Sequence, residues 1–260
     1  MPELPEVEMA RRFVDEHLRG KRVISLEVLD GRMLACGSET AMREAFLGQT
    51  VIGARRHGKH LLIMIGEDHL YIHLGMSGSL HLMDDGERSS HERLRLSLDE
   101  GNLVLNDPRR FGRFGIFHSV DDLLAERNLG PDALTVSDQL FASRMSGRRG
   151  SLKPLLLDQS FIAGVGNLYA DESLFQERLH PALKSDDLSG KDMSKLARRV
   201  RRVLETSISV RTEFSRLPEG FLLRDRREGA PCPRCSTALV AIRLGGRTTV
   251  LCPKCQNQQR

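Results

Sequence analysis

The chain has 260 residues, of which 40% are apolar, so it is long enough for one large domain or two to three small ones. No run approaches the roughly 18 consecutive apolar residues of a membrane-spanning helix, which excludes that class of protein. The formal net charge is only +4, but the segment from Cys232 to the last residue holds five basic residues and no Asp or Glu. We therefore expect this segment to contact an anion.

The first predicted element is an amphipathic helix near the start of the chain. Apolar residues recur there at spacings of three and four: Val7, Ala10, Val14 and Leu18. Pro5 lies near the first turn and Gly20 follows the last apolar position, as helix ends favour. The opening residues lack a basic stretch followed by an apolar segment, so we expect no secretory signal and a reducing, cytoplasmic location without disulfides.

Beyond this helix the apolar period changes to two. Alternating or continuous apolar runs predict strands at residues 24–28, 61–65, 70–74, 94–98 and 103–105. The helix and these strands together predict an N-terminal domain over residues 1–125, built as a β-sandwich or barrel.

From about Pro131 the strand pattern gives way to helical patterns at residues 153–157, 168–175 and 193–208. The last helix is the clearest, because its apolar residues line one face while four arginines lie mostly off it, and Ser189 is the expected N-cap. We predict a helical domain over residues 126–225 and a loop or linker between Glu205 and Pro231.

The strongest single motif is a pair of C-x-x-C sequences near the end of the chain. Cys232 and Cys235 are separated by sixteen residues from Cys252 and Cys255. Four thiolates suit one tetrahedral zinc ion, and a short segment of low apolar content needs such a metal to fold. Disulfides and a redox pair are the alternatives, disfavoured by the reducing location and by the paired motifs. The fifth cysteine, Cys36, is expected to be an ordinary small apolar residue.

The residues between the two cysteine pairs predict a β-hairpin, with strands at 239–244 and 248–251 around the turn Gly245-Gly246. Residues 226–260 therefore form a predicted zinc finger. Because it is basic and lacks acids, we expect it to bind nucleic-acid phosphates, with Arg247 near the turn. A solvated surface charge is the alternative for each individual arginine.

Pro2 is the second unusual feature. Removal of the initiator Met1 would expose a secondary amine, and an α-amino group has a pKa of about 8, so a useful fraction is neutral at physiological pH. Such an amine can form an iminium with a carbonyl carbon, and Glu3 and Glu6 would lie close to it, as proton donors or to hold it in place. The residues alone do not favour catalysis, since Pro is common at position two and a retained Met1 would leave an amide.

Five motifs in one order resemble the formamidopyrimidine-DNA glycosylase and endonuclease VIII family, the glycosylase more closely. They are Met1-Pro2-Glu3-Leu4-Pro5-Glu6-Val7-Glu8, His73-Leu74-Gly75-Met76-Ser77-Gly78, Asp107-Pro108-Arg109-Arg110-Phe111-Gly112, Gly164-Val165-Gly166-Asn167 and the four cysteines. The resemblance implies an α+β multidomain enzyme: an N-terminal helix plus β-sandwich, a helix-two-turns-helix domain and a four-cysteine zinc-finger hairpin.

The resemblance also implies the chemistry of a bifunctional glycosylase and lyase of base excision repair. Pro2 would attack C1′ of a nucleotide flipped out of duplex DNA, and Glu3 would protonate the opening sugar. Lys59 matches the lysine assigned to phosphate contact and proton transfer in the first elimination, and Arg247 matches the arginine of the δ-elimination. Glu6 is expected to support the nucleophile.

Further positions match the family's contacts to DNA. Met76, Arg109 and Phe111 would fill the space left by the flipped base, although Met and Phe are ordinarily core residues. Asn167 would hold a phosphate beside backbone N–H groups. His91, Arg149 and Lys153 occupy other DNA-contacting positions, Arg149 standing where lysine is common. We expect a monomer that binds damaged or abasic double-stranded DNA, associates with the nucleoid and contacts no membrane.

The sequence departs from the family pattern after the last predicted helix. Many members carry there a longer loop with a Gly-Gly-Thr-Thr stretch and a tyrosine, whereas here the interval is short and the only tyrosines are Tyr71 and Tyr169. The pair Arg109 and Phe111 favours oxidised purines opposite cytosine. An endonuclease VIII-like specificity for oxidised pyrimidines and a non-catalytic zinc-containing nucleic-acid binder are the alternatives.

Overall fold

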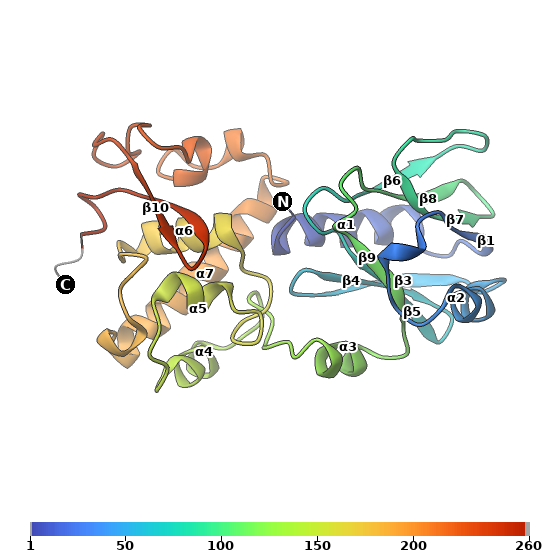
Figure 1. Ribbon diagram of the computed structural model, residues 1–260, viewed down its shortest axis with the longest axis horizontal. Coiled ribbons are helices and arrows are strands. Elements are labelled where there is room, and N and C mark those ends of the chain that lie inside the picture. Colours follow the sequence, from blue (N-terminus) through green and yellow to red (C-terminus); the bar gives the residue numbers. More distant parts are fainter. Residues whose placement is uncertain (1, 258–260) are drawn as a thin grey trace. The chain divides into compact units, whose positions relative to one another are not determined.

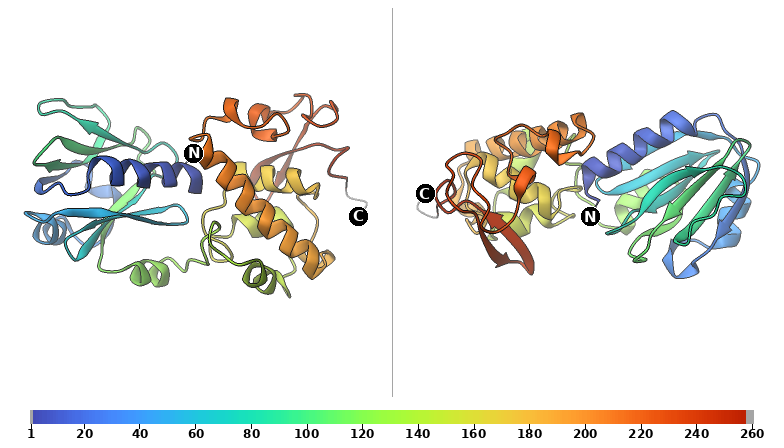
Figure 2. Two further views of the ribbon diagram at one scale, coloured as in Figure 1. Left: turned by 180° about the vertical axis from the view of Figure 1, so that it is seen from behind. Right: turned by 90° about the horizontal axis from the view of Figure 1, so that it is seen from above.

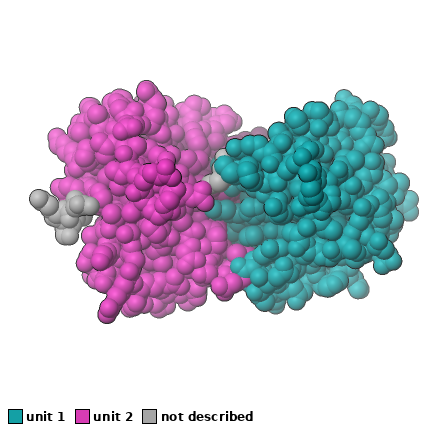
Figure 3. Space-filling view, in the orientation of Figure 1, with its two compact units in different colours: residues 1–2, 6–127 teal, residues 3–5, 128–260 magenta. Residues whose placement is uncertain are grey.

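The computed structural model describes residues 2–257, arranged as two compact units (Figure 3). Pro2 and Glu6–Arg127 form the first unit, and Glu3–Pro5 belong with the second, which continues from Asn128. The second unit thus includes both the helical region and the cysteine-rich region. The end of the predicted zinc finger, residues 258–260, lies outside the described residues.

The first unit contains two β-sheets. One sheet has four antiparallel strands in the order β1 (Val23–Val28), β7 (Glu92–Leu98), β8 (Asn102–Asn106) and β6 (Ser79–Met83). The other has the order β2 (Leu34–Cys36), β9 (Arg113–Phe117), β5 (Asp68–His73), β4 (His60–Ile65) and β3 (Val51–His57), parallel only between β2 and β9.

Both sheets and two helices contribute to one apolar core. Helix α1 (Leu4–His17) buries Val7 and Val14 against it, Leu18 follows directly, and α2 (Glu39–Phe46) adds Phe46. Figure 2 shows α1 lying along the sheets of this unit. The predicted N-terminal helix and β-sandwich are therefore confirmed. The apolar period of about 3.6 residues in the helix and of two in the strands indicates which side of each element faces this core.

The strands that the sequence did not predict have weak apolar patterns. β3 ends in Arg55-Arg56-His57, β6 is partly exposed on both faces, and β9 is short and contains Gly115. Helix α3 (Val120–Glu126) was also missed, although Ser119 caps it by accepting a hydrogen bond from the Asp122 N–H. These elements form because neighbouring strands and loops complete their hydrogen bonding, which the sequence pattern does not report.

Helices dominate the second unit (Figure 1). They are α4 (Asp138–Met145), α5 (Leu152–Leu157), α6 (Asn167–Glu177) and α7 (Gly190–Ser209). Helix α7 packs its apolar face against α4 and α6, and the Ser189 hydroxyl accepts the Asp192 N–H, so the predicted N-cap is confirmed. Helix α6 is buried over almost its whole length, including the acids Asp171 and Glu172.

The prediction of a loop from Glu205 is wrong at its start, because α7 continues to Ser209. The rest of this interval contains two short 3-10 helices, Phe214–Arg216 and Leu222–Asp225. Leu217, Leu222 and Leu223 are buried, so the segment is packed rather than a solvated linker.

The predicted hairpin is confirmed as β10 (Val240–Leu244) and β11 (Arg247–Leu251). Both turn residues, Gly245 and Gly246, have positive φ, which is the conformation that a two-residue hairpin turn favours. A small apolar core joins the hairpin to Phe175 of α6. Among the helices of residues 2–257, none combines the length and apolar character that crossing a membrane requires.

Candidate active site and nucleic-acid interface

Three of the predicted DNA-contacting side chains gather on two neighbouring loops of the first unit. Met76 lies in the β5–β6 loop, and Arg109 and Phe111 lie in the β8–β9 loop. Arg109 donates from Nη2 to the Met76 carbonyl oxygen over 3.1 Å, and its guanidinium carbon lies 5.6 Å from the Phe111 ring centroid. Met76 is 38% exposed and Phe111 52% exposed, so neither is a core residue.

One buried carboxylate holds these two loops together. Asp107 has no exposed surface and accepts hydrogen bonds from the Ser77 hydroxyl (2.5 Å) and the Gly112 N–H (2.7 Å). Gly75 has a φ of +61°, and a Cβ there would lie 2.4 Å from the Phe111 carbonyl carbon. The motif that contains Asp107 was identified in the sequence, but this role was not, because it depends on a residue 30 positions away.

His91 lies close to the same aspartate. Its backbone carbonyl accepts the Asp107 N–H over 2.9 Å, and its side chain is exposed just before β7. The structure therefore brings His91 to the loops that carry Met76 and Arg109.

Lys59 lies in the two-residue turn between β3 and β4, after Gly58 with its φ of +56°. Two histidines lie near it, of which His60 is buried and His73 half-buried. His60 Nδ1 is 3.0 Å from the Tyr71 hydroxyl, and His73 Nδ1 accepts the Gly75 N–H over 3.1 Å. Burial lowers the pKa of His60 to about 3 and that of His73 to about 4, and the charge of Lys59 adds to both effects. Both rings are therefore uncharged at neutral pH.

Pro2 and Glu6 lie at the beginning of the first unit. Pro2 is half-buried and immediately precedes the segment that starts α1, and Glu6 is the acidic residue of the first turn. Glu6 is half-buried and takes part in an interaction within the molecule. The predicted removal of Met1 lies outside the described residues.

Glu3 is fully buried at the start of α6 in the second unit. Its carboxylate accepts the Leu168 N–H over 2.8 Å and the Tyr169 N–H over 3.4 Å. A Cβ on Gly166 would lie 2.3 Å from the Glu3 carboxyl carbon, so glycine is required there for the close approach. A carboxylate at this end of a helix is stabilised by the backbone N–H groups and the helix dipole.

Asn167 is the first residue of α6. Its Oδ1 is buried and has no hydrogen-bond partner within the described part of the chain. Gln159 fixes the preceding turn, because its side chain accepts the Gly164 N–H and donates to the Val165 carbonyl, both over 2.9 Å. Glu3 occupies two N–H groups of this helix end. The unpartnered Oδ1 is an acceptor, so an anion at this site would have to bind the Asn167 side-chain NH2 group.

Lys153, which was predicted to contact DNA, is buried in this structure. Lys153 has no exposed surface, and its Nζ lies 2.7 Å from the Asp171 carboxylate and donates to Thr249 Oγ1 over 2.8 Å. Burial lowers the pKa of Lys153, and Asp171 opposes this shift. Lys153 thus joins α5 to the strand that begins at Arg247. Arg149, in contrast, is exposed in the loop before α5.

The four predicted metal ligands form one cluster. Their Sγ atoms all lie within 4.8 Å of one another, with Cys235 3.5 Å from both Cys252 and Cys255, and Cys232 3.9 Å from Cys255. Zinc–sulfur bonds of about 2.3 Å at tetrahedral angles place sulfurs roughly 3.8 Å apart. The cluster therefore fits one structural zinc ion. Cys36 lies apart on β2, and burial raises the pKa of its thiol.

The basic residues of the finger have different roles. Arg247 is exposed at the start of β11, next to the hairpin turn. Arg234 is half-buried, donates to the Phe175 carbonyl and to Gln176 Oε1, both over 2.7 Å, and lies 4.4 Å from the Phe175 ring centroid. Arg234 therefore attaches the finger to α6, whereas Arg247 remains available to an external anion.

Family models match almost the whole chain. They are the formamidopyrimidine-DNA glycosylase N-terminal domain at residues 1–114, the H2TH domain of the same enzymes at 129–218, and the zinc finger found in FPG and IleRS at 229–258.

Curated relatives match over their full length. The formamidopyrimidine-DNA glycosylase of Hahella chejuensis is 36% identical and that of Alcanivorax borkumensis 37% identical, each match covering 98% of this chain and 100% of the relative.

Solved structures give the same result. Lactococcus lactis formamidopyrimidine-DNA glycosylase, bound non-covalently to DNA containing an AP site, matches with a TM-score of 0.89 and 28% identity. MutM in complex with DNA containing carbocyclic 8-oxo-G matches with a TM-score of 0.89 and 30% identity. Both cover 99% of this chain and 100% of the other.

Proposed function

The chain belongs to the formamidopyrimidine-DNA glycosylase family, and we propose that it excises oxidised purines from double-stranded DNA and then cuts the strand at the abasic site. The observation that carries this proposal is the cluster of Met76, Arg109 and Phe111. Two large apolar side chains and a guanidinium are exposed on loops fixed by Asp107, which suits insertion into a base stack.

The reaction begins with the neutral secondary amine of Pro2. Its nitrogen forms a bond to C1′ of the flipped nucleotide while the bond from C1′ to the base breaks, and the base leaves as an anion that takes a proton from water. The carboxylate of Glu3, which follows Pro2 directly in the chain, takes up the proton that the Pro2 nitrogen releases and passes it to the sugar ring oxygen as the ring opens, giving an iminium. Its fixed position at the start of α6 limits where that proton is delivered.

Strand cleavage follows from the iminium. It acidifies the C2′ proton, and loss of this proton expels the 3′ phosphate by β-elimination. A second proton loss expels the 5′ phosphate by δ-elimination. Lys59 acts in the first elimination, and Arg247 holds the phosphate in the second. Zinc, when bound to the four cysteines, orders the hairpin that presents Arg247 and takes no part in the bond changes.

We propose the remaining DNA contacts from the positions that these residues share with the family's DNA-contacting residues. Asn167 and Arg149 of the second unit and His91 of the first bind phosphates, and Glu6 supports the nucleophile. Lys153 is a positioning residue. The protein acts as a monomer, and its DNA substrate places it at the nucleoid.

Borohydride trapping tests the catalytic proposal. We expect a covalent adduct with an oligonucleotide that carries an abasic site or 8-oxoguanine opposite cytosine, and Pro2→Gly should lose most of it while the variant still binds the same DNA. An absence of adduct in the wild-type protein would leave only a zinc-containing nucleic-acid binder.

The alternative function is that of an endonuclease VIII-like enzyme, which would excise oxidised pyrimidines instead of oxidised purines. The observation that favours it is the interval between α7 and the finger, which lacks tyrosine. Comparing single-turnover excision of 8-oxoguanine opposite cytosine with that of thymine glycol decides between them, and we expect the former to be faster.

A further inference from the structure

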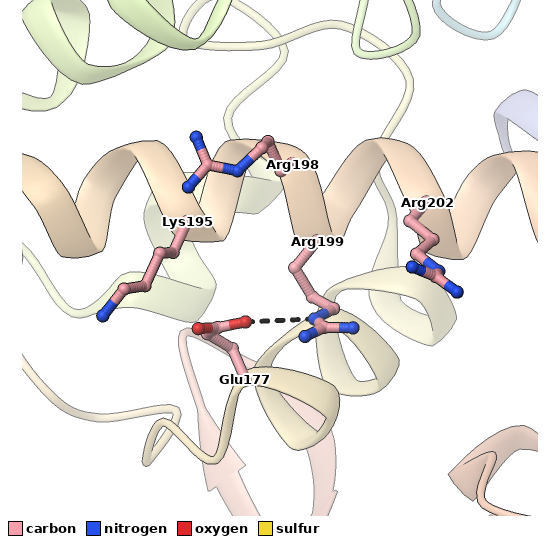
Figure 4. A pocket seen from close by; sticks show the side chains of 5 residues that line it. All are labelled: Glu177, Lys195, Arg198, Arg199 and Arg202. Atoms are coloured by element: carbon pink, nitrogen blue, oxygen red, sulfur yellow. Dashed lines mark hydrogen bonds and ion pairs between the residues drawn. The ribbon is translucent and has the colours of Figure 1, made fainter.

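A basic hollow lies along the exposed side of α7. Lys195, Arg199 and Arg202 recur at spacings of four and three, so they project from the same side of this helix. Figure 4 shows them with Glu177, which extends from the end of α6 and accepts a hydrogen bond from Arg199 Nε over 3.0 Å. The hollow has a volume of about 290 Å³, and Arg198 completes its lining.

A second hollow of about 310 Å³ continues from the first, because Arg199 and Arg202 line both. Its other lining includes the apolar side chains of Pro218 and Phe221. The two hollows therefore form one groove, which we call the α7 groove, with a basic part and a partly apolar part.

The cations of the α7 groove outnumber the acids. Four cationic side chains and one carboxylate line its basic part. Arg202 is exposed and makes no side-chain hydrogen bond or ion pair within residues 2–257. Lys195 pairs with Asp192, Arg198 with Asp138 and Arg199 with Glu177, so Arg202 is the cation of the groove that an anionic partner would meet first.

The α7 groove is distinct from the residues assigned to DNA in this unit. Asn167 begins α6 and Glu177 ends it, and ten residue steps of 1.5 Å separate them by about 15 Å. The hairpin with Arg247 also lies on another side of α6, since β10 is in front of α6 in Figure 1 and α7 is in front in the reverse view of Figure 2.

We propose that the α7 groove docks an acidic peptide segment of a partner protein, with carboxylates on Arg199 and Arg202 and one aromatic or large aliphatic side chain against Phe221. Arginine pairs with carboxylates through two parallel hydrogen bonds, which suits this arrangement. A regular DNA backbone has no apolar side chain for the second hollow. The proposal is independent of the glycosylase activity.

Fluorescence anisotropy of a labelled peptide, titrated with the full-length zinc-loaded protein, tests whether the α7 groove binds an acidic peptide. The probe is a fluorescein-labelled peptide of eight alternating Asp and Glu residues with one central Phe. We expect saturable binding, weakened at least about tenfold by Arg202→Glu and unchanged by Lys191→Glu, which alters the net charge equally from an exposed position outside the groove. Phe221→Ala should weaken binding of this peptide but not of one with Ala in place of Phe.

Arg202→Glu and Lys191→Glu also distinguish a peptide-binding groove from a nucleic-acid surface and from an effect of net charge alone. Arg202→Glu should leave excision of 8-oxoguanine and binding of an undamaged 20-base-pair duplex unchanged. Equal loss of peptide binding in Arg202→Glu and Lys191→Glu would overturn the proposal, because only net charge would then matter. Loss of duplex binding in Arg202→Glu would overturn it in favour of a nucleic-acid surface.

Discussion

Lys153 and Asp171 form an ion pair of 2.7 Å in which neither side chain has any exposed surface. Asp171 also pairs with Arg226 and accepts the Val250 N–H of β11 over 3.0 Å. One carboxylate therefore joins α5, α6 and the hairpin. Because Arg247 begins β11, this buried network fixes the strand that carries this exposed arginine of the finger.

Replacement of Asp171 by Asn should destabilise the protein strongly. The buried ammonium of Lys153 would lose its counter-ion, and breaking a buried pair costs about 3–5 kcal/mol of unfolding free energy. Thermal and denaturant unfolding measure this loss. Asp186→Asn, a matched change at an exposed position, should alter stability by less than about 0.5 kcal/mol. If Asp171→Asn and Asp186→Asn had similar unfolding free energies, the ion pair of Lys153 and Asp171 would not stabilise the attachment of the finger.

Phe111→Ala should reduce excision while leaving the fold unchanged. The side chain is half exposed, so its removal creates little cavity, but we expect single-turnover excision of 8-oxoguanine to fall at least about tenfold, equivalent to about 1.4 kcal/mol. Leu82→Ala removes a comparably exposed apolar side chain from β6 and should have no effect on excision. Unfolding curves of both variants check the fold. An undiminished rate in Phe111→Ala would remove this residue from the interface.

Stability should depend on pH through Glu172. Burial raises its pKa from 4.5 to about 7, and Gln176, Leu223 and Arg234 partly oppose the shift. Between these values the folded protein binds more protons than the unfolded chain, so the unfolding free energy falls as pH rises, by roughly 3 kcal/mol at most.

The matched variant is Glu172→Gln, which can still accept the Leu223 N–H. We expect its stability relative to wild type to increase from pH 4.5 to 7 and then to stay constant. His60 and His73, whose pKa values are lowered in the folded protein, have the opposite effect below pH 6.5, but they are present in both proteins and cancel in the difference. A difference that does not vary with pH would mean that Glu172 is ionised throughout.

Loss of the metal should unfold the finger. Cys252 has no exposed surface and lies in the small core with Phe175, so Cys252→Ser should abolish binding of the single zinc ion and loosen the hairpin. Metal analysis by mass spectrometry and proteolysis after β10 measure the two effects. Cys36→Ser, a control on the fifth cysteine, should retain one zinc per chain. Equal zinc content in both variants would contradict the four-cysteine site.

The features that could be predicted are those whose residues lie close together along the chain. Spacing alone located the metal site at Cys232 and Cys252, the turn at Gly245-Gly246 and the long helix α7. The roles of Asp107 and Asp171 could not be predicted, because their partners are distant in sequence and come together only by folding. The burial of Lys153 could not be predicted for the same reason, because its partner Asp171 lies in another helix.

Helix α6 is attached at both ends by groups from distant parts of the chain. Glu3 binds its first turn, and Arg234 of the finger binds the carbonyl of Phe175 in its last turn. Helix α6 thus links the cysteine cluster of the finger to Glu3, which we propose as the proton-transferring acid. Oxidants attack cysteine sulfur, so we expect oxidation of the cluster to loosen the finger at one end of α6 and to disturb Glu3 at the other. Severe oxidative stress would then lower the rate of the proposed repair reaction.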